Sequence, residues 1–85
     1  MLIVDDEVRL AEAFKEQLID EGMDVVTVSC AGDALSLIPN EMFDVAVVDI
    51  RLPDMDGVQL LLRLKQMEPT MEVIMLTGYA SVNTA

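Results

Sequence analysis

Three apolar stretches that end in oxygen-bearing side chains decide the fold of this chain: residues 2–6 (LIVDD), 45–49 (VAVVD) and 73–78 (VIMLTG). Short apolar runs of this kind predict buried strands. If the strands are parallel neighbours, their carboxyl ends meet at one edge of a sheet, where open α/β folds bind ligands. Four polar side chains are then expected close together at this edge: Asp5, Asp6, Asp49 and Thr77.

Strand-like and helix-like periodicity alternate along the chain. In chain order, strands are expected at residues 1–4, 24–29, 43–48 and 72–76, alternating with helices at 7–21, 31–38 and 58–67. Gly22 is expected to end the first helix, and Pro53 and Gly57 mark a loop over residues 51–57. Residues 81–85 are expected to begin another helix. This order predicts an α/β fold with a doubly wound parallel sheet, covered by helices on both faces.

Length and composition exclude several classes of protein. Eighty-five residues form one small domain, spanning 1–85. Sixteen acidic residues against five basic ones give a net charge of −11, which argues against nucleic-acid contact by this segment. No apolar run approaches the ~20 residues that span a membrane, and acidic residues follow the first four at once, unlike a signal peptide. A soluble protein is therefore expected.

The reactive residue types narrow the chemistry further. The chain has one cysteine, Cys30, so no internal disulfide can form, which fits a cytoplasmic protein. The chain contains no histidine. An internal Ser-His-Asp triad is therefore excluded, and a zinc site is disfavoured. Carboxylates and hydroxyls remain as the groups that could carry a function.

The three aspartates at the expected strand ends suggest a cation site. Asp5 or Asp6 could instead cap the following helix, an alternative that explains one aspartate but not two. Asp49 ends a buried run and begins no helix, and a buried carboxylate is costly unless it is paired or metal-bound. An all-oxygen set favours Mg²⁺ or Mn²⁺, and a carboxylate there could act as a nucleophile towards a phosphoryl group. Thr77 and Gly78 either form a strand-ending turn or offer a hydroxyl and a backbone N–H to phosphoryl oxygens.

Three ordered motifs carry a resemblance to a known family: residues 2–7 (LIVDDE), 49–57 (DIRLPDMDG) and 76–79 (LTGY). Over nearly its whole length, the chain resembles the receiver domain of two-component response regulators. The resemblance implies a flavodoxin-like fold with strand order 2-1-3-4, which would lack the family's fifth strand and last helix. The TGYAS stretch at residues 77–81 looks most like receivers of σ54-dependent activators.

The resemblance also implies a role for each residue of the site. Asp49 would accept a phosphoryl group from the phosphohistidine of a sensor histidine kinase. Asp6, Asp49 and the backbone carbonyl of Arg51 would bind Mg²⁺ or Mn²⁺ directly, and Asp5 would bind it through a water molecule.

The remaining implied roles concern the response to phosphorylation. Thr77 would contact the phosphoryl group and act as the switch residue, and the Gly78 backbone N–H would bond the same group. The domain would be a signalling domain rather than a turnover enzyme. Its change of conformation would control an output domain, and through it transcription.

One departure from the family pattern affects the site and the sheet. Receivers carry a lysine after a fifth strand, whereas this chain has no lysine after Lys65. The chain is therefore interpreted as a truncated receiver. Without a fifth strand the edge of strand 72–76 is open, and we expect a homodimer through this edge or through exchanged elements.

Two other functions are compatible with parts of the sequence. A pseudo-receiver would act as an interaction module that never carries phosphate in this form. A haloacid-dehalogenase-like phosphatase is suggested by Asp54, Asp56 and Gly57, which match that family's nucleophile motif. That motif directly follows a buried strand, whereas here residues 51–53 (RLP) precede it, so the match is weak.

Overall fold

The seven expected elements are all present in the computed structural model, which describes residues 1–76. Their bounds are β1 Leu2–Val4, α1 Val8–Asp20, β2 Val26–Val28, α2 Ala31–Leu37, β3 Val45–Asp49, α3 Gly57–Met67 and β4 Glu72–Leu76. Each boundary lies within a residue or two of its prediction. The expected helix start at 81–85 lies outside the described residues.

The four strands form one parallel sheet in the order β2-β1-β3-β4, which confirms the expected strand order. β1 is central, and its Val4 pairs with Val28 on one side and with Val48 on the other. At the other end of the order, β4 pairs with β3, so that Asp49 lies opposite Leu76. All four strands therefore end at the same edge of the sheet.

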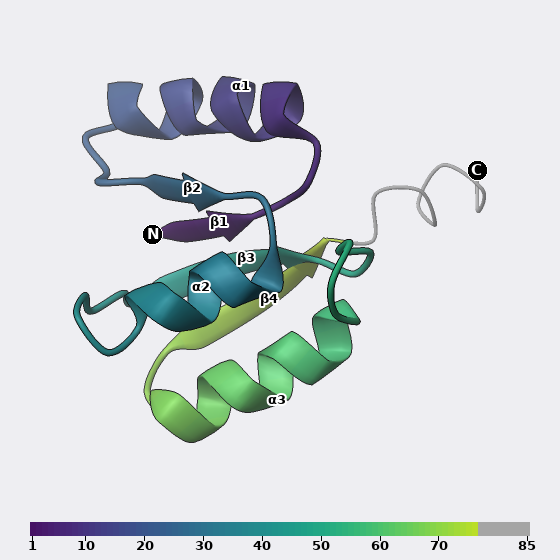
Figure 1. Cartoon of the computed structure of the whole chain (residues 1–85). Coiled ribbons are helices and arrows are strands. Elements are labelled where there is room, and N and C mark those ends of the chain that lie inside the picture. The colour runs from purple at the N-terminus through teal and green to yellow at the C-terminus, as the bar shows by residue number, and fades with distance from the viewer. Residues whose placement is uncertain (77–85) are drawn as a thin grey trace.

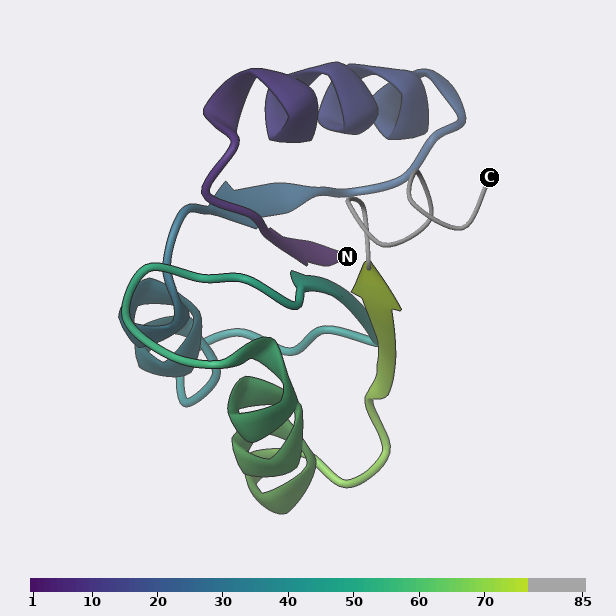
Figure 2. The same cartoon turned by 90° about the vertical axis from the view of Figure 1, so that its right-hand side faces the viewer.

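Helices cover both faces of this sheet, as predicted (Figures 1 and 2). Leu2 and Val4 point to one face, where they pack in a core with residues of α2 and α3. Ile3 points to the other face and packs with residues of α1. This alternation follows from the two-residue period of a strand, and it makes β1 a part of both cores.

The end of α1 shows how one glycine sets an element boundary. Gly22 has a φ of +87°, a conformation that residues with a side chain rarely adopt. Its N–H donates to Ile19 O at 2.9 Å, and the Met23 N–H donates to Leu18 O at 3.1 Å. This pair of bonds is a Schellman motif, so the prediction that Gly22 ends the helix is confirmed.

The observed helices are also short or polar. In the part of the chain that the structure describes, no helix is long and apolar enough to cross a membrane.

Candidate functional site

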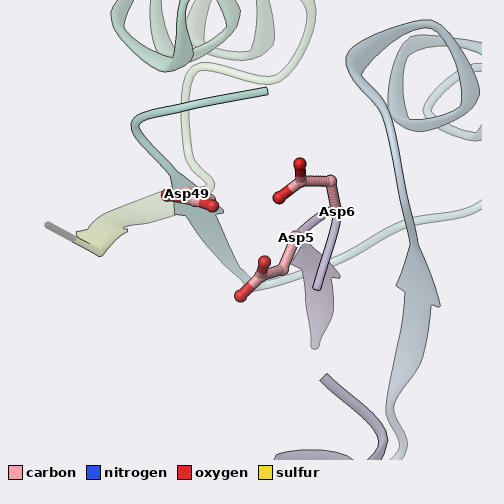
Figure 3. Close-up of side chains that lie close together, drawn as sticks. All are labelled: Asp5, Asp6 and Asp49. Atoms are coloured by element: carbon pink, nitrogen blue, oxygen red, sulfur yellow. The ribbon is translucent and has the colours of Figure 1, made fainter. Parts of the chain in front are cut away.

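Three aspartates meet at the carboxyl edge of the sheet, as the sequence predicted (Figure 3). Asp5 and Asp6 directly follow β1, and Asp49 is the last residue of β3. Each contributes a carboxylate oxygen to a group whose members all lie within 4.8 Å of one another. The parallel register explains this meeting, since Val4 and Val48 pair and the next residue of each strand is an aspartate.

Asp5 is the buried member of this acidic cluster (Asp5, Asp6 and Asp49), with 4% of its surface exposed. One of its carboxylate oxygens accepts a hydrogen bond from the Glu7 N–H at 2.9 Å. Burial raises the pKa of Asp5 above its ordinary value. The Glu7 N–H opposes this shift, and the negative charges of Asp49 and Asp6 add to it. The geometry thus holds Asp5 where its negative charge is costly.

The alternative in which Asp5 or Asp6 caps the first helix is wrong. The N-cap of α1 is Glu7, and its side chain makes no capping bond. The first intrahelical bond runs from the Ala11 N–H to the Glu7 carbonyl at 3.0 Å. Asp6 is exposed beside this turn. Neither aspartate caps α1, and both lie in the group of carboxylates at the edge of the sheet.

Asp49 is half-buried, so its carboxylate is more accessible than that of Asp5. One of its oxygens accepts a hydrogen bond from the Arg51 N–H at 3.2 Å. This bond ties the phosphoacceptor candidate to the start of the loop over residues 50–56. It also places the Arg51 backbone next to the acidic cluster.

The base of the 50–56 loop is closed by backbone bonds. The Gly57 N–H donates to the Ile50 carbonyl at 2.9 Å, and Arg51 and Asp56 form an isolated antiparallel bridge. Asp56 then caps α3, since its carboxylate accepts a bond from the Val58 N–H at 2.9 Å. A Cβ at Gly57 would overlap the Asp49 carbonyl oxygen and lie 2.7 Å from the Ile50 Cα. Glycine is therefore required at 57 for close approach of two backbones.

Asp54 has a structural role that the sequence reasoning missed. Its two carboxylate oxygens accept hydrogen bonds from the Ala31 and Gly32 N–H groups, each at 2.9 Å. These bonds lower the pKa of the Asp54 carboxyl below its ordinary value. The sequence held one signal of this role: the residue before the helix start at Ala31 is Cys30, which is not an ordinary capping residue, so a cap from elsewhere in the chain was to be expected.

The remaining predicted residues are placed as follows. Thr77 and Gly78 lie outside the described residues. Lys65 lies on α3, and its ammonium donates to the Met71 carbonyl at 2.7 Å, just before β4 begins. Lys65 therefore lies at the amino end of β4, whereas the acidic cluster lies at the carboxyl edge of the sheet, so it does not supply the lysine that was expected beside the cluster.

An open hollow of about 260 Å³ is lined by Asp5 and by Val8 and Ala11 of α1. Its lining also includes Thr27, Ser29 and Asp33 from the end of β2 and the start of α2. The all-carboxylate set fits a hard cation such as Mg²⁺, which prefers oxygen ligands. The three carboxylates can therefore hold such a cation beside the half-buried Asp49.

Residues 1–85 match the response regulator receiver domain, and the chain belongs to that family. It is 35% identical to the alginate biosynthesis transcriptional regulatory protein AlgB of Pseudomonas aeruginosa, over all of this chain and 19% of AlgB. The chain thus spans about a fifth of the length of this curated relative. That relative is a transcriptional regulatory protein, in agreement with the expected likeness to receivers of σ54-dependent activators.

Solved structures agree with this assignment. A CheY-like receiver domain from Methanospirillum hungatei JF-1 is 44% identical, with a TM-score of 0.89 over 96% of this chain and 66% of that chain. The response regulator TrrA of Thermotoga maritima, solved in complex with Mg²⁺-BeF, is 28% identical, with a TM-score of 0.86 over 98% and 72%.

Family membership decides between the receiver and the haloacid-dehalogenase-like phosphatase. Receiver domains are signalling domains and not turnover enzymes, so the phosphatase interpretation is wrong. The structure gives the physical reason. Of the two aspartates in the supposed nucleophile motif, Asp54 is bonded to the start of α2 and Asp56 caps α3.

Proposed function

We propose that this chain is a phospho-accepting receiver in which Asp49 takes a phosphoryl group from the phosphohistidine of a sensor histidine kinase. The observation that carries the proposal is the acidic cluster, whose three carboxylates lie within 4.8 Å of one another at one sheet edge. Asp49 is the member that combines partial exposure with a fixed position at the end of β3.

Each aspartate has a separate task in this proposal. Asp6 and Asp49 bind Mg²⁺ or Mn²⁺ with their carboxylates, the Arg51 carbonyl is a further ligand, and buried Asp5 acts through a water molecule. The bound cation supplies positive charge that offsets the repulsion between the carboxylates and the incoming phosphoryl oxygens.

The transfer itself is a nucleophilic displacement at phosphorus. A carboxylate oxygen of Asp49 forms a bond to phosphorus while the P–N bond of the phosphohistidine breaks. The electron pair of that bond stays on the imidazole nitrogen. A ring that already carries a proton on its other nitrogen leaves as neutral imidazole, and a ring without that proton takes one up from solvent. The Arg51 N–H bond to Asp49 holds the carboxylate in place for this step.

The response to phosphorylation involves residues beyond the described part. We assign Thr77 as the switch residue that contacts the phosphoryl group, and the Gly78 N–H as a second donor. The altered receiver surface acts on an output domain or effector, and transcription is the output that the similarity to AlgB, a transcriptional regulatory protein, favours. A cytoplasmic location follows from a kinase partner of this type.

Incubation of the chain with acetyl phosphate and Mg²⁺, followed by intact-mass measurement, tests the proposal. The expected result is a gain of one phosphoryl group that disappears in Asp49→Asn and persists in Asp44→Asn, which removes an exposed carboxylate before β3. No gain in a folded wild-type chain would instead support the pseudo-receiver, an interaction module without phosphorylation. Far-UV circular dichroism establishes that each sample is folded.

A further inference from the structure

The helix α2 begins without a capping side chain of its own. Its N-cap residue is Cys30, which has an extended backbone and makes no side-chain capping bond. The first N–H groups of a helix have no partner within the helix, and an adjacent Ser, Thr, Asp or Asn usually accepts from one of them. At α2, Asp54 accepts these bonds instead, from the Ala31 and Gly32 N–H groups, which are 23 and 22 residues away in the sequence.

The Asp54 carboxylate makes a two-pronged contact with α2. One oxygen accepts from the Ala31 N–H and the other from the Gly32 N–H, both at 2.9 Å. A Cβ at Gly32 would lie 3.3 Å from an Asp54 carboxylate oxygen, so the contact is already close-packed. The negative charge is also favourably placed at the positive end of a helix. The contact therefore restrains both the position and the orientation of Asp54.

This contact is a further attachment of the 50–56 loop, besides the Arg51 N–H bond to Asp49. Two backbone contacts close the base of the loop, the Gly57 N–H bond to the Ile50 carbonyl and the bridge between Arg51 and Asp56. Asp54 lies between these points along the chain and fastens that part of the loop to α2. A loop held at its base and across its span has little freedom to shift the Arg51 backbone relative to Asp49.

We propose that Asp54 is a positioning residue for the cation site, which holds the 50–56 loop against α2 so that the Arg51 carbonyl stays within reach of the cation. The inference rests on the proposed function, because it takes the Arg51 carbonyl as a ligand. Groups that orient metal ligands typically change metal affinity by about 10- to 100-fold when they are removed. Loss of the Asp54 carboxylate is expected to weaken cation binding by about tenfold.

A pair of variants separates positioning from simple helix capping. Asp54→Ala removes both the cap of α2 and the attachment of the loop. The double variant Cys30→Asp with Asp54→Ala places a new cap at the start of α2 and retains the net charge, but the loop still lacks its attachment to α2. Thermal unfolding monitors the helix cap, and Mn²⁺ binding, read from the electron paramagnetic resonance signal of free Mn²⁺, monitors the site. Asp44→Asn controls for the loss of a surface charge.

The expected result is a dissociation constant for Mn²⁺ about tenfold higher in Asp54→Ala, and equally high in the double variant even though its unfolding temperature recovers. Recovery of both properties in the double variant overturns the inference, because Asp54 would then only cap α2. Wild-type affinity in Asp54→Ala overturns it as well. Failure of the proposed function looks different, since the wild-type chain would itself bind no Mn²⁺ and take up no phosphoryl group.

Discussion

Replacement of the buried carboxylate, Asp5→Asn, is predicted to stabilise the chain when divalent cations are absent. Asp5 is 4% exposed and shares a space 4.8 Å across with the carboxylates of Asp49 and Asp6. Two unit charges at that separation repel by about 1 kcal/mol in water and by about 3.5 kcal/mol at an effective dielectric constant of 20. Because Asp6 is exposed, its share lies near the lower value. The asparagine oxygen can still accept the Glu7 N–H bond.

The expected gain in the free energy of unfolding is therefore about 1–3 kcal/mol at pH 7.5 in EDTA. It is measured by urea denaturation followed by far-UV circular dichroism, with Asp44→Asn as the control for an exposed carboxylate. Addition of Mg²⁺ should narrow this difference, since a ligand at ten times its dissociation constant stabilises the chain that binds it by about 1.4 kcal/mol. An Asp5→Asn chain that is no more stable than wild type in EDTA would refute the reasoning.

The sign of the pH dependence gives a second measurement on the same variant. The folded state raises the pKa of Asp5, so the folded chain holds this proton more tightly than the unfolded chain. Stability of the wild-type chain then falls as the pH rises from the ordinary value of 3.8 through the raised pKa. Asp5→Asn lacks this contribution. The stability difference between the two chains should consequently grow over this pH range in EDTA.

Five other changes have defined outcomes. Gly57→Ala should lower the free energy of unfolding by about 1–3 kcal/mol or more, because the added Cβ overlaps backbone atoms. Gly22→Ala has open space around it, so in urea denaturation it should cost only the about 1–2 kcal/mol of a side chain at positive φ. Asp56→Ala removes the α3 cap and should cost about 1 kcal/mol in the same assay. Asp54 has a lowered pKa, so its contribution to stability is present above pH 3.8 and is lost as the pH falls through that lowered pKa. The free energy of unfolding of Asp54→Asn should therefore fall less steeply than that of wild type below pH 3.8. Finally, sedimentation velocity should show self-association through the β4 edge that Ile74→Lys weakens, since Ile74 is 51% exposed; a monomer at all concentrations would exclude it.

The meeting of Asp5, Asp6 and Asp49 could be predicted because it depends on only two regularities. Apolar runs identify the strands, and the rules for parallel α/β sheets bring their carboxyl ends together. The role of Asp54 depends on a contact between residues more than twenty positions apart, which no local pattern encodes.

The constraint at Gly57 and the start of β3 could also be read only from the structure. The sequence marked Gly57 as part of a loop, but the backbone that excludes a side chain there belongs to Asp49 and Ile50. Phe43 was expected in a strand because it is apolar. It is buried in the core just before β3 begins at Val45, so burial was predicted correctly and pairing was not.

The central strand has a chemical consequence as well as a packing one. Leu2 and Val4 belong to one core and Ile3 to the other, so a slip of one residue would turn every side chain of β1 to the wrong face. The same slip would move Asp6 into the buried position that Asp5 now occupies. Two adjacent residues with identical side chains are therefore made chemically different, one buried and one exposed, by the three apolar residues that precede them.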